Sequence, residues 1–189
     1  VAKVFGKGSS FPGQVALKLC PDILSRIKMP KYIIAVTGSN GKTSTVEMIA
    51  HILLKNGKKV AWNKEGSNQI EGVTTLVLSN SSLFGKVKSD ILLIESDERF
   101  AKYTFKYITP THYVITNLYR DQLTRNGHPE WVYDAISQSI HPETKLILNA
   151  DDPLVSLFGY GKKDVIWFGA DKLSTVTESL DSVYVEGAY

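Results

Sequence analysis

The sequence has 189 residues, of which 43% are hydrophobic and 22% charged, and its formal net charge is +3. This length favours one domain with an appendage, and the composition is that of an ordinary globular protein. A net charge this small does not indicate a nucleic-acid partner. The single cysteine, Cys20, excludes an internal disulfide and a cysteine-based zinc site within the chain. No uncharged apolar run approaches ~18 residues and residues 1–11 lack a signal-peptide core, so we expect a cytoplasmic protein without a membrane-spanning helix.

The N-terminal part, residues 1–31, is predicted to be an arm followed by short helices. Residues 1–13 are rich in Gly, Ser and Lys, which is typical of a loop. Residues 15–27 carry apolar side chains at helical spacing, with a break near Pro21. We interpret this segment as one or two short helices that pack on the edge of the domain.

The strongest functional signal is the stretch from 32 to 44, Tyr-Ile-Ile-Ala-Val-Thr-Gly-Ser-Asn-Gly-Lys-Thr-Ser. Its apolar start predicts a buried strand, and the apolar spacing after Thr43 predicts a helix. Between them, Gly38 and Gly41 permit unusual backbone angles, Lys42 supplies a positive charge, and the hydroxyl of Thr43 or Ser44 can reach Mg²⁺. The alternative is a turn whose glycines serve only the chain reversal. We predict a phosphate-binding loop for a nucleotide, formed by Gly38, Ser39, Asn40, Gly41, Lys42, Thr43 and Ser44.

A second polar cluster follows the next buried strand. The helix after the loop is expected to end near residue 55, with a short strand at 59–62, a polar loop at 63–68 and a helical pattern at 69–83. The strand at 91–94 ends in Glu95-Ser96-Asp97-Glu98. A carboxylate at a strand tip is where nucleotide-dependent enzymes hold Mg²⁺, so Glu95 is the predicted metal ligand. Alternatively, Ser96 or Asp97 caps the following helix, and both roles can coexist.

The remaining elements complete an alternating pattern. Strands are expected at 112–116, 145–148 and 164–168, and helices at 130–140 and from Pro153 onward, with Asn117 at a strand's carboxyl end. Alternating strands and helices predict an α/β fold, a three-layer P-loop domain with a mainly parallel sheet. We place this domain at residues 32–170 and assign residues 171–189 to a tail.

Several stretches around the loop also carry a family signature. They are VTGSNGKTS (36–44), SFPGQVALKLCPDIL (10–24), NKEGSN (63–68), ESDE (95–98), TNLYRDQLTRNG (116–127) and LNADDP (148–153). The first and last resemble the central domain of the Mur ligases, the amide-forming enzymes of peptidoglycan precursor synthesis. The others narrow the resemblance to the MurT-like branch, the ligase subunits of lipid II isoglutaminyl synthases. The resemblance extends from about residue 6 to residue 169.

The resemblance implies a specific chemistry. It implies an ATP-dependent ligase that amidates the D-glutamate α-carboxyl of lipid II to D-isoglutamine through an acyl phosphate. Ammonia would come from a GatD-like glutamine amidotransferase partner, and ATP and Mg²⁺ would be the cofactors. By this resemblance Lys42 and Glu95 would be catalytic, with Lys42 on the β- and γ-phosphates and Thr43 and Glu95 on Mg²⁺. Asn68 would lie near the γ-phosphate and Asn149 near the nucleoside.

The chain also departs from the general Mur ligase pattern. Gln122 and Thr124 stand where Mur ligases usually carry a histidine and an acidic residue, and no lysine lies between Lys106 and Lys145 to be carbamylated. MurT relatives add a zinc ribbon and a C-terminal domain, so zinc is expected only there. We expect residues 1–189 alone to bind nucleotide weakly and without turnover. Alternatives are another Mur-like amide ligase, of the folylpolyglutamate or poly-γ-glutamate synthase type, and a non-catalytic nucleotide-binding fragment.

Overall fold

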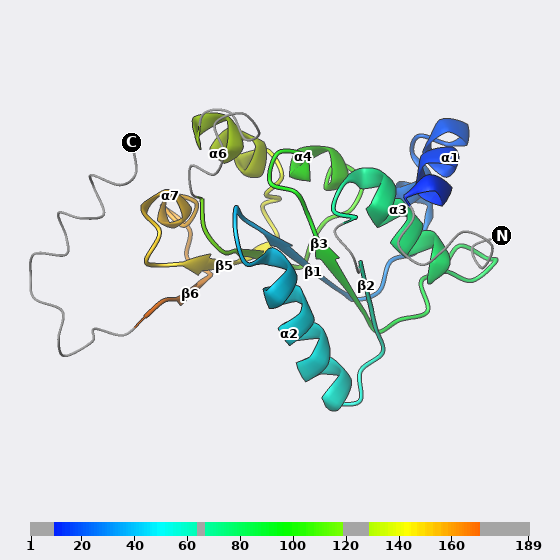
Figure 1. Ribbon diagram of the computed structural model, residues 1–189, viewed down its shortest axis with the longest axis horizontal. Helices are drawn as coiled ribbons and strands as arrows, with labels where there is room; N and C mark the ends of the chain where they lie inside the picture. The colour runs from blue at the N-terminus through cyan, green and yellow to red at the C-terminus, as the bar shows by residue number, and fades with distance from the viewer. Residues whose placement is uncertain (1–9, 64–66, 119–128, 171–189) are drawn as a thin grey trace, which may run out of the picture.

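The computed structural model describes residues 10–63, 67–118 and 129–170, which form an α/β domain around one parallel sheet (Figure 1). The six strands pair in the order β2-β3-β1-β4-β5-β6, and every pairing between neighbours is parallel. The strands are β1 (Tyr32–Thr37), β2 (Val60–Trp62), β3 (Ile91–Glu95), β4 (His112–Ile115), β5 (Lys145–Asn149) and β6 (Val165–Phe168). The predicted three-layer fold with a parallel sheet is confirmed.

Helices cover both faces of the sheet (Figure 1). One face packs against α2 (Lys42–Lys55), whose Val46 and Ala50 contact the buried Val36, Leu93 and Val114 of the central strands. The other face packs against α3 (Ile70–Ser79), α4 (Ala101–Thr104), α6 (Pro129–Ser137) and α7 (Pro153–Leu157). Because both faces are covered, the central strands are apolar on both sides, which is the pattern that parallel sheets require. This is why residues 32–36 of β1 and 91–94 of β3 are continuous apolar or aromatic runs.

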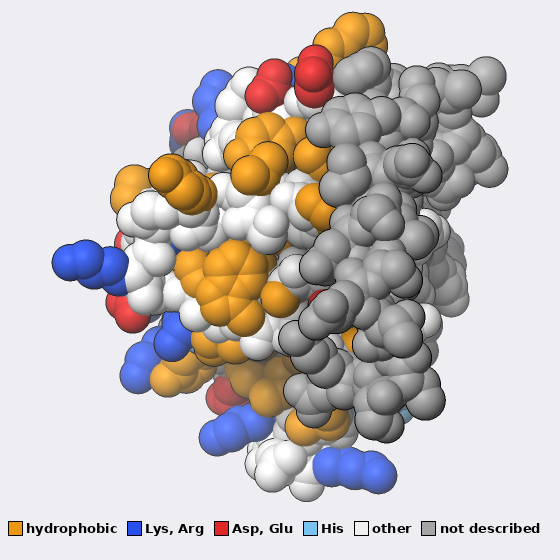
Figure 2. Space-filling model, turned by 90° about the vertical axis from the view of Figure 1, so that its left-hand side faces the viewer, with side chains coloured by type: hydrophobic (Ala, Val, Ile, Leu, Met, Phe, Trp, Pro, Cys, Tyr) orange, Lys and Arg blue, Asp and Glu red, His pale blue; other side chains and the backbone are white. Residues whose placement is uncertain are grey.

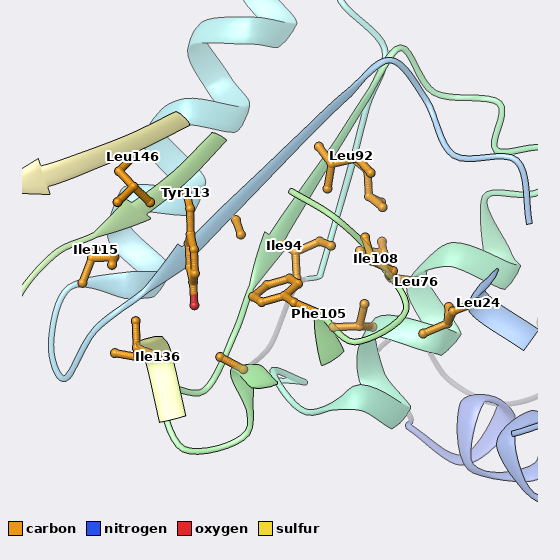
Figure 3. Close-up of a cluster of buried hydrophobic side chains, with 14 of the residues drawn as sticks. Leu24, Leu76, Leu92, Ile94, Phe105, Ile108, Tyr113, Ile115, Ile136 and Leu146 are labelled. Carbon is orange, nitrogen blue, oxygen red and sulfur yellow. The ribbon is translucent and has the colours of Figure 1, made fainter. Parts of the chain in front are cut away.

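The larger core lies between the sheet and α3, α4 and α6 (Figure 3). Its widest side chains are Tyr113 of β4 and Phe105, whose rings meet edge to face with centroids 5.3 Å apart. The Tyr113 hydroxyl is paired with Ser139 Oγ at 3.1 Å, which satisfies the one polar atom of that side chain. Burial raises the pKa of Tyr113 above its ordinary value.

The N-terminal helices fit the predicted break near Pro21. Helix α1 (Phe11–Leu19) is followed by a short 3₁₀-helix at Ile23–Arg26. The first helix starts earlier than the apolar spacing indicated, because Pro12 is well suited to a helix's first turn. It packs closely on α3, where Gly13 N donates to Thr75 Oγ1 at 2.9 Å and any larger residue would overlap the Glu71 carbonyl.

At the other edge of the sheet, formed by β6, the strand side chains are much less covered by other elements of the described ranges. Strand β6 lies at the sheet edge, and Ile166, Trp167 and Phe168 are each at least 40% exposed. Figure 2 looks onto this end of the molecule, where hydrophobic side chains reach the surface beside residues that lie outside the described part. The predicted tail, residues 171–189, is among those residues. No helix in the described ranges is long and apolar enough to cross a membrane.

Candidate functional site: a phosphate loop between two strand ends

The predicted phosphate loop lies at the carboxyl end of β1 and leads directly into α2. Gly41 precedes the helix with φ +78°, a left-handed conformation that favours glycine, and a Cβ built there would meet nothing within 4 Å. The first amides of α2 have no acceptor within the helix, and the helix dipole makes this end positive. The start of α2 therefore offers the amide donors and the open space that suit an anion.

Gly38 is needed for close packing of the loop and does not leave open space beside it. Its φ is +135°, and a Cβ built on it would overlap the Thr116 hydroxyl and come within 2.9 Å of the Asn117 carbonyl oxygen. Gly38 is thus needed where the loop passes close to the end of β4. Both glycines have the unusual backbone angles that the sequence predicts, but only Gly41 also leaves open space beside the loop.

The end of β4 fixes the loop backbone through hydrogen bonds. Ser39 N donates to the Asn117 carbonyl at 2.8 Å, and Asn40 N donates to Asn117 Oδ1 at 2.8 Å. The Asn40 carbonyl accepts from Asn117 Nδ2 at 3.1 Å and from Thr116 Oγ1 at 2.9 Å. Sequence reasoning placed Asn117 at a strand end but assigned it no role. The structure shows that the Asn117 side chain forms hydrogen bonds with both the backbone N–H and the carbonyl of Asn40.

Lys42 folds back over its own loop. Its ammonium group donates to the carbonyls of Gly38 and Ser39 and forms an ion pair with Glu98 Oε2 at 3.0 Å. The side chains of Lys42 and Glu98 are only 14% and 6% exposed, so the pair is largely shielded from water. The strand-end motif drew attention to Glu98 but did not predict this partner, which lies 56 residues away in sequence.

The two predicted metal ligands lie together beside the loop. Thr43 Oγ1 donates to Glu95 Oε2 at 3.0 Å, and Glu95 is 3% exposed at the tip of β3. Its backbone is held by Asn63, whose Oδ1 accepts from Glu95 N at 2.7 Å and whose Nδ2 donates to Glu95 O at 2.8 Å. Apart from the polar loop after β2, no sequence pattern indicated these hydrogen bonds between Asn63 and Glu95.

These residues fit a magnesium ion bound together with a nucleotide. A hydroxyl and a carboxylate are hard oxygen donors, and Mg²⁺ in nucleotide sites uses one or two such groups with phosphates and water. Among the described residues, no cluster of three or more His, Cys, Asp or Glu could hold a metal without such help.

The alternative helix-capping role for the acidic stretch is wrong. The residue before α4 is Phe100, with no side-chain cap, because the helix begins only at Ala101 and is four residues long. Asp97 instead accepts from Arg99 N at 3.0 Å and Arg99 Nη2 at 2.8 Å. Burial alone would raise the pKa of Asp97, but the hydrogen bonds and charge of Arg99 outweigh it and lower that pKa. The Ser96 hydroxyl is buried and has no hydrogen-bond partner in the described ranges.

The two predicted asparagines lie in different parts of the site, since Asn68 follows β2 and Asn149 ends β5, with β3, β1 and β4 between these strands. The carbonyl of Asn68 accepts from Asp97 N at 3.0 Å, which places Asn68 beside the acidic stretch. Asn149 Nδ2 donates to the Thr116 carbonyl at 2.9 Å, and its Oδ1 accepts from Asp151 N at 2.9 Å. The Asn149 side chain therefore ties the ends of β4 and β5 together. Ser44 is exposed on the first turn of α2, and Gln122 and Thr124 lie outside the described residues.

Comparison with known proteins gives the family. A family model described as Mur ligase middle domain matches residues 36–186. A lipid II isoglutaminyl synthase (glutamine-hydrolyzing) subunit MurT from Staphylococcus aureus (strain COL) is 34% identical over 165 residues, 86% of this chain and 37% of that protein. The subunit of the same description from Streptococcus pneumoniae (strain ATCC BAA-255 / R6) is 39% identical over 152 residues, 79% of this chain and 33% of that protein. The chain thus spans about a third of the length of these curated relatives.

A solved structure agrees with this at the level of the fold. The MurF ligase of Thermotoga maritima in complex with ADP matches with a TM-score of 0.58 and 21% identity, over 83% of this chain and 36% of that one. The sequence match over most of the chain, the parallel sheet and the loop between β1 and α2 lead to one conclusion. The chain belongs to the Mur ligase family, of which it carries the middle domain.

Proposed function

We propose that this chain is the nucleotide-binding part of an ATP-dependent, amide-forming ligase of peptidoglycan synthesis. The proposed reaction amidates the D-glutamate α-carboxyl of lipid II to D-isoglutamine, with ammonia from a GatD-like glutamine amidotransferase partner. The two MurT relatives support the substrate and the partner, since their names describe a glutamine-hydrolyzing lipid II isoglutaminyl synthase. Family membership supports the ligase chemistry, and the loop geometry supports the role of a nucleotide.

One observation carries the proposal most directly. Thr43 and Glu95 meet at 3.0 Å at the start of α2, and the ammonium group of Lys42 lies over the same loop. A positive helix end, a lysine and a hydroxyl–carboxylate pair are the groups that hold the phosphates and metal of ATP. When bound, Mg²⁺ would be held by Thr43 and Glu95 and would neutralise charge on the transferred phosphoryl group.

The proposed reaction has two steps. A substrate carboxylate oxygen attacks the γ-phosphorus of ATP, the bond to the β-phosphate oxygen breaks, and an acyl phosphate and ADP result. Ammonia then attacks the acyl carbon, inorganic phosphate leaves, and the nitrogen loses a proton to give the amide. In the first step Lys42 would leave Glu98 and stabilise the charge on the β- and γ-phosphates, while the backbone amides of the loop orient them.

The test uses the full-length protein with its amidotransferase partner, lipid II, ATP and glutamine. Mass spectrometry measures the conversion of the lipid II carboxyl to a carboxamide. Lys42→Ala should reduce the rate by about 100-fold or more, because a charge that stabilises the transition state is lost. Lys162→Ala, which changes an exposed lysine beyond α7, should leave the rate unchanged. Unchanged amidation by Lys42→Ala would contradict the proposed nucleotide site.

The same assay separates the alternatives. Amidation of lipid II argues against another Mur-like ligase, such as a folylpolyglutamate or poly-γ-glutamate synthase. ATP-dependent addition of an amino acid to a different carboxylate, with no change in lipid II, would favour that alternative. Nucleotide binding without any product would favour a non-catalytic module. For residues 1–189 alone we propose weak nucleotide binding without turnover, which titration calorimetry with ATP and Mg²⁺ tests directly.

A further inference from the structure

Two large apolar side chains project into solvent from a tight turn between α3 and β3. Leu83 is 104% exposed and Phe84 is 98% exposed, the highest values among the large apolar residues of the described ranges. The turn is closed by hydrogen bonds, since Gly85 N donates to Ser82 O at 3.0 Å and Ser82 N donates to Lys86 O at 2.8 Å. Gly85 has φ +69°, a conformation that lets the chain reverse here.

The turn is anchored to the body of the domain on its other side. Lys28 N donates to Gly85 O at 2.8 Å, and Val87 N donates to Lys28 O at 3.0 Å. The Val87 side chain is 3% exposed and belongs to the core. Because both flanks of the turn are fixed, the exposure of its tip is a built feature of the fold. Two adjacent large apolar side chains held together in solvent form an apolar tip, and contiguous exposed apolar surface is what marks protein or membrane contact sites.

Beside this turn lies a cleft of about 700 Å³ with a strongly basic lining. Its lining includes Tyr32 and Ile91, the first residues of β1 and β3, so the cleft lies at the amino ends of these strands, whereas the phosphate loop follows the carboxyl end of β1. Its one acidic side chain, Asp90, accepts from Lys59 N at 2.9 Å. Five lysines line it, all exposed and none in an ion pair with another described residue: Lys28, Lys31, Lys58, Lys86 and Lys88.

We propose that this basic edge, defined by the Leu83–Phe84 turn and the five cleft lysines, docks on an anionic lipid bilayer. Lysines near a negatively charged membrane surface attract it electrostatically, while leucine and phenylalanine enter the boundary between headgroups and acyl chains. A soluble anion would use the lysines but would leave the two apolar side chains in water. The combination of charge and an apolar tip is therefore what favours a bilayer.

This docking is independent of the ligase chemistry, because none of these residues contacts the phosphate loop. The phosphate loop lies at the carboxyl end of β1, whereas the docking surface lies at the amino ends of β1 and β3, so docking leaves the loop accessible to solvent. Each lysine that approaches an anionic surface contributes about fivefold to the binding constant. Removing the apolar tip should reduce binding by about tenfold or more, since two large side chains then no longer leave water.

The experiment measures cosedimentation of the purified chain with vesicles. One set contains phosphatidylcholine only, and the other contains phosphatidylcholine with phosphatidylglycerol. The test variants are Leu83→Ser/Phe84→Ser and Lys86→Glu/Lys88→Glu. Their matched controls are Leu157→Ser/Tyr160→Ser and Lys162→Glu/Lys163→Glu, which change exposed residues at the β6 end. Circular dichroism and unfolding midpoints verify that each variant is folded.

We expect binding to the anionic vesicles only, with a decrease at raised salt. The apolar double variant should bind about tenfold or more weakly, and the two charge reversals should reduce binding by more than the neutral loss of two lysines would. Both controls should bind like the unmodified chain. Absence of binding, equal binding to neutral vesicles, or equal losses in the controls would overturn the proposal. So would a Leu83→Ser/Phe84→Ser variant that binds as well as the unmodified chain, since the lysines alone would then describe a site for soluble polyanions or acidic proteins.

Discussion

Replacing Glu98 with Gln should have opposite effects on stability and on nucleotide binding. The Glu98 carboxylate holds the Lys42 ammonium group at 3.0 Å, next to the loop where phosphates are proposed to bind. Gln keeps the size and one hydrogen-bond acceptor but removes the charge. Without nucleotide, Lys42 loses its counter-charge and the chain should become less stable. With nucleotide but no metal, the anionic phosphates no longer meet a buried carboxylate, so they should bind more tightly.

The magnitudes follow from the shielding of the pair. The two side chains are 14% and 6% exposed, and removing one partner of a buried ion pair typically costs about 3–5 kcal/mol. Because Gln retains a hydrogen bond, we expect a loss of about 1–3 kcal/mol in the free energy of unfolding. A carboxylate at ~8 Å from a phosphate, at an effective dielectric constant of ~20, opposes binding by about 2 kcal/mol. The affinity for metal-free ATP should therefore rise by about 30-fold.

Urea unfolding measures the first effect, and titration calorimetry with ATP in EDTA measures the second. Glu143→Gln is the control, because that carboxylate is exposed in the turn before β5 and far from the loop. It should change neither quantity. If Glu98→Gln instead weakens metal-free ATP binding, then Glu98 holds Lys42 in the position that phosphates need. The interpretation that the Glu98 carboxylate opposes phosphate binding would then be wrong.

Three further predictions concern the surroundings of the site. Asn117→Ala should weaken nucleotide binding in calorimetry by about 5- to 100-fold, because two hydrogen bonds that order the Asn40 peptide are lost. Asp152→Ala should lower the urea unfolding free energy by about 2–4 kcal/mol, since this buried carboxylate caps α7 and accepts from the amide that follows Asn117 at 2.7 Å. Burial and a nearby lysine lower the pKa of His112 in the folded state, so the unfolded state binds more protons and stability should fall as the pH drops below 6.5. His112→Gln should reduce that pH dependence, whereas His51→Gln, on the exposed side of α2, should retain it.

The fold and the phosphate loop could be predicted because their signals are local. Apolar runs at 32–36 and 91–94 identify the central strands, and the change to helical spacing after Thr43 identifies α2. The family resemblance put Thr43 and Glu95 on the same metal ion, and in the structure the parallel strands β1 and β3 bring the two residues together at their carboxyl ends. The prediction that Ser96 or Asp97 caps the following helix was wrong because the residue pattern does not indicate how long the turn before α4 is.

The contacts that complete the site could not be predicted from spacing. Lys42 meets Glu98 across 56 residues, Asn63 meets Glu95 across 32, and Asn40 meets Asn117 across 77. Each contact depends on the strand order β2-β3-β1-β4, which places these strand ends next to one another. A polar residue at a strand end is a weak signal, because the same residue types suit any turn.

Because β1 lies between β3 and β4, the phosphate loop is held by two kinds of contact, one at the end of each neighbouring strand. On the β4 side, Asn117 holds the loop backbone through neutral hydrogen bonds, and a phosphate or metal would not take the place of Asn117 in them. On the β3 side, Glu98 and Glu95 hold the side chains of Lys42 and Thr43, which are the groups that phosphate and metal would take. Removing the first kind of contact should therefore loosen the loop in every state. Removing Glu98 should affect chiefly the state without nucleotide, whereas Glu95 would also be needed with the metal bound. Ligand binding at this site would then be an exchange of partners on the β3 side, over a backbone already held by the end of β4.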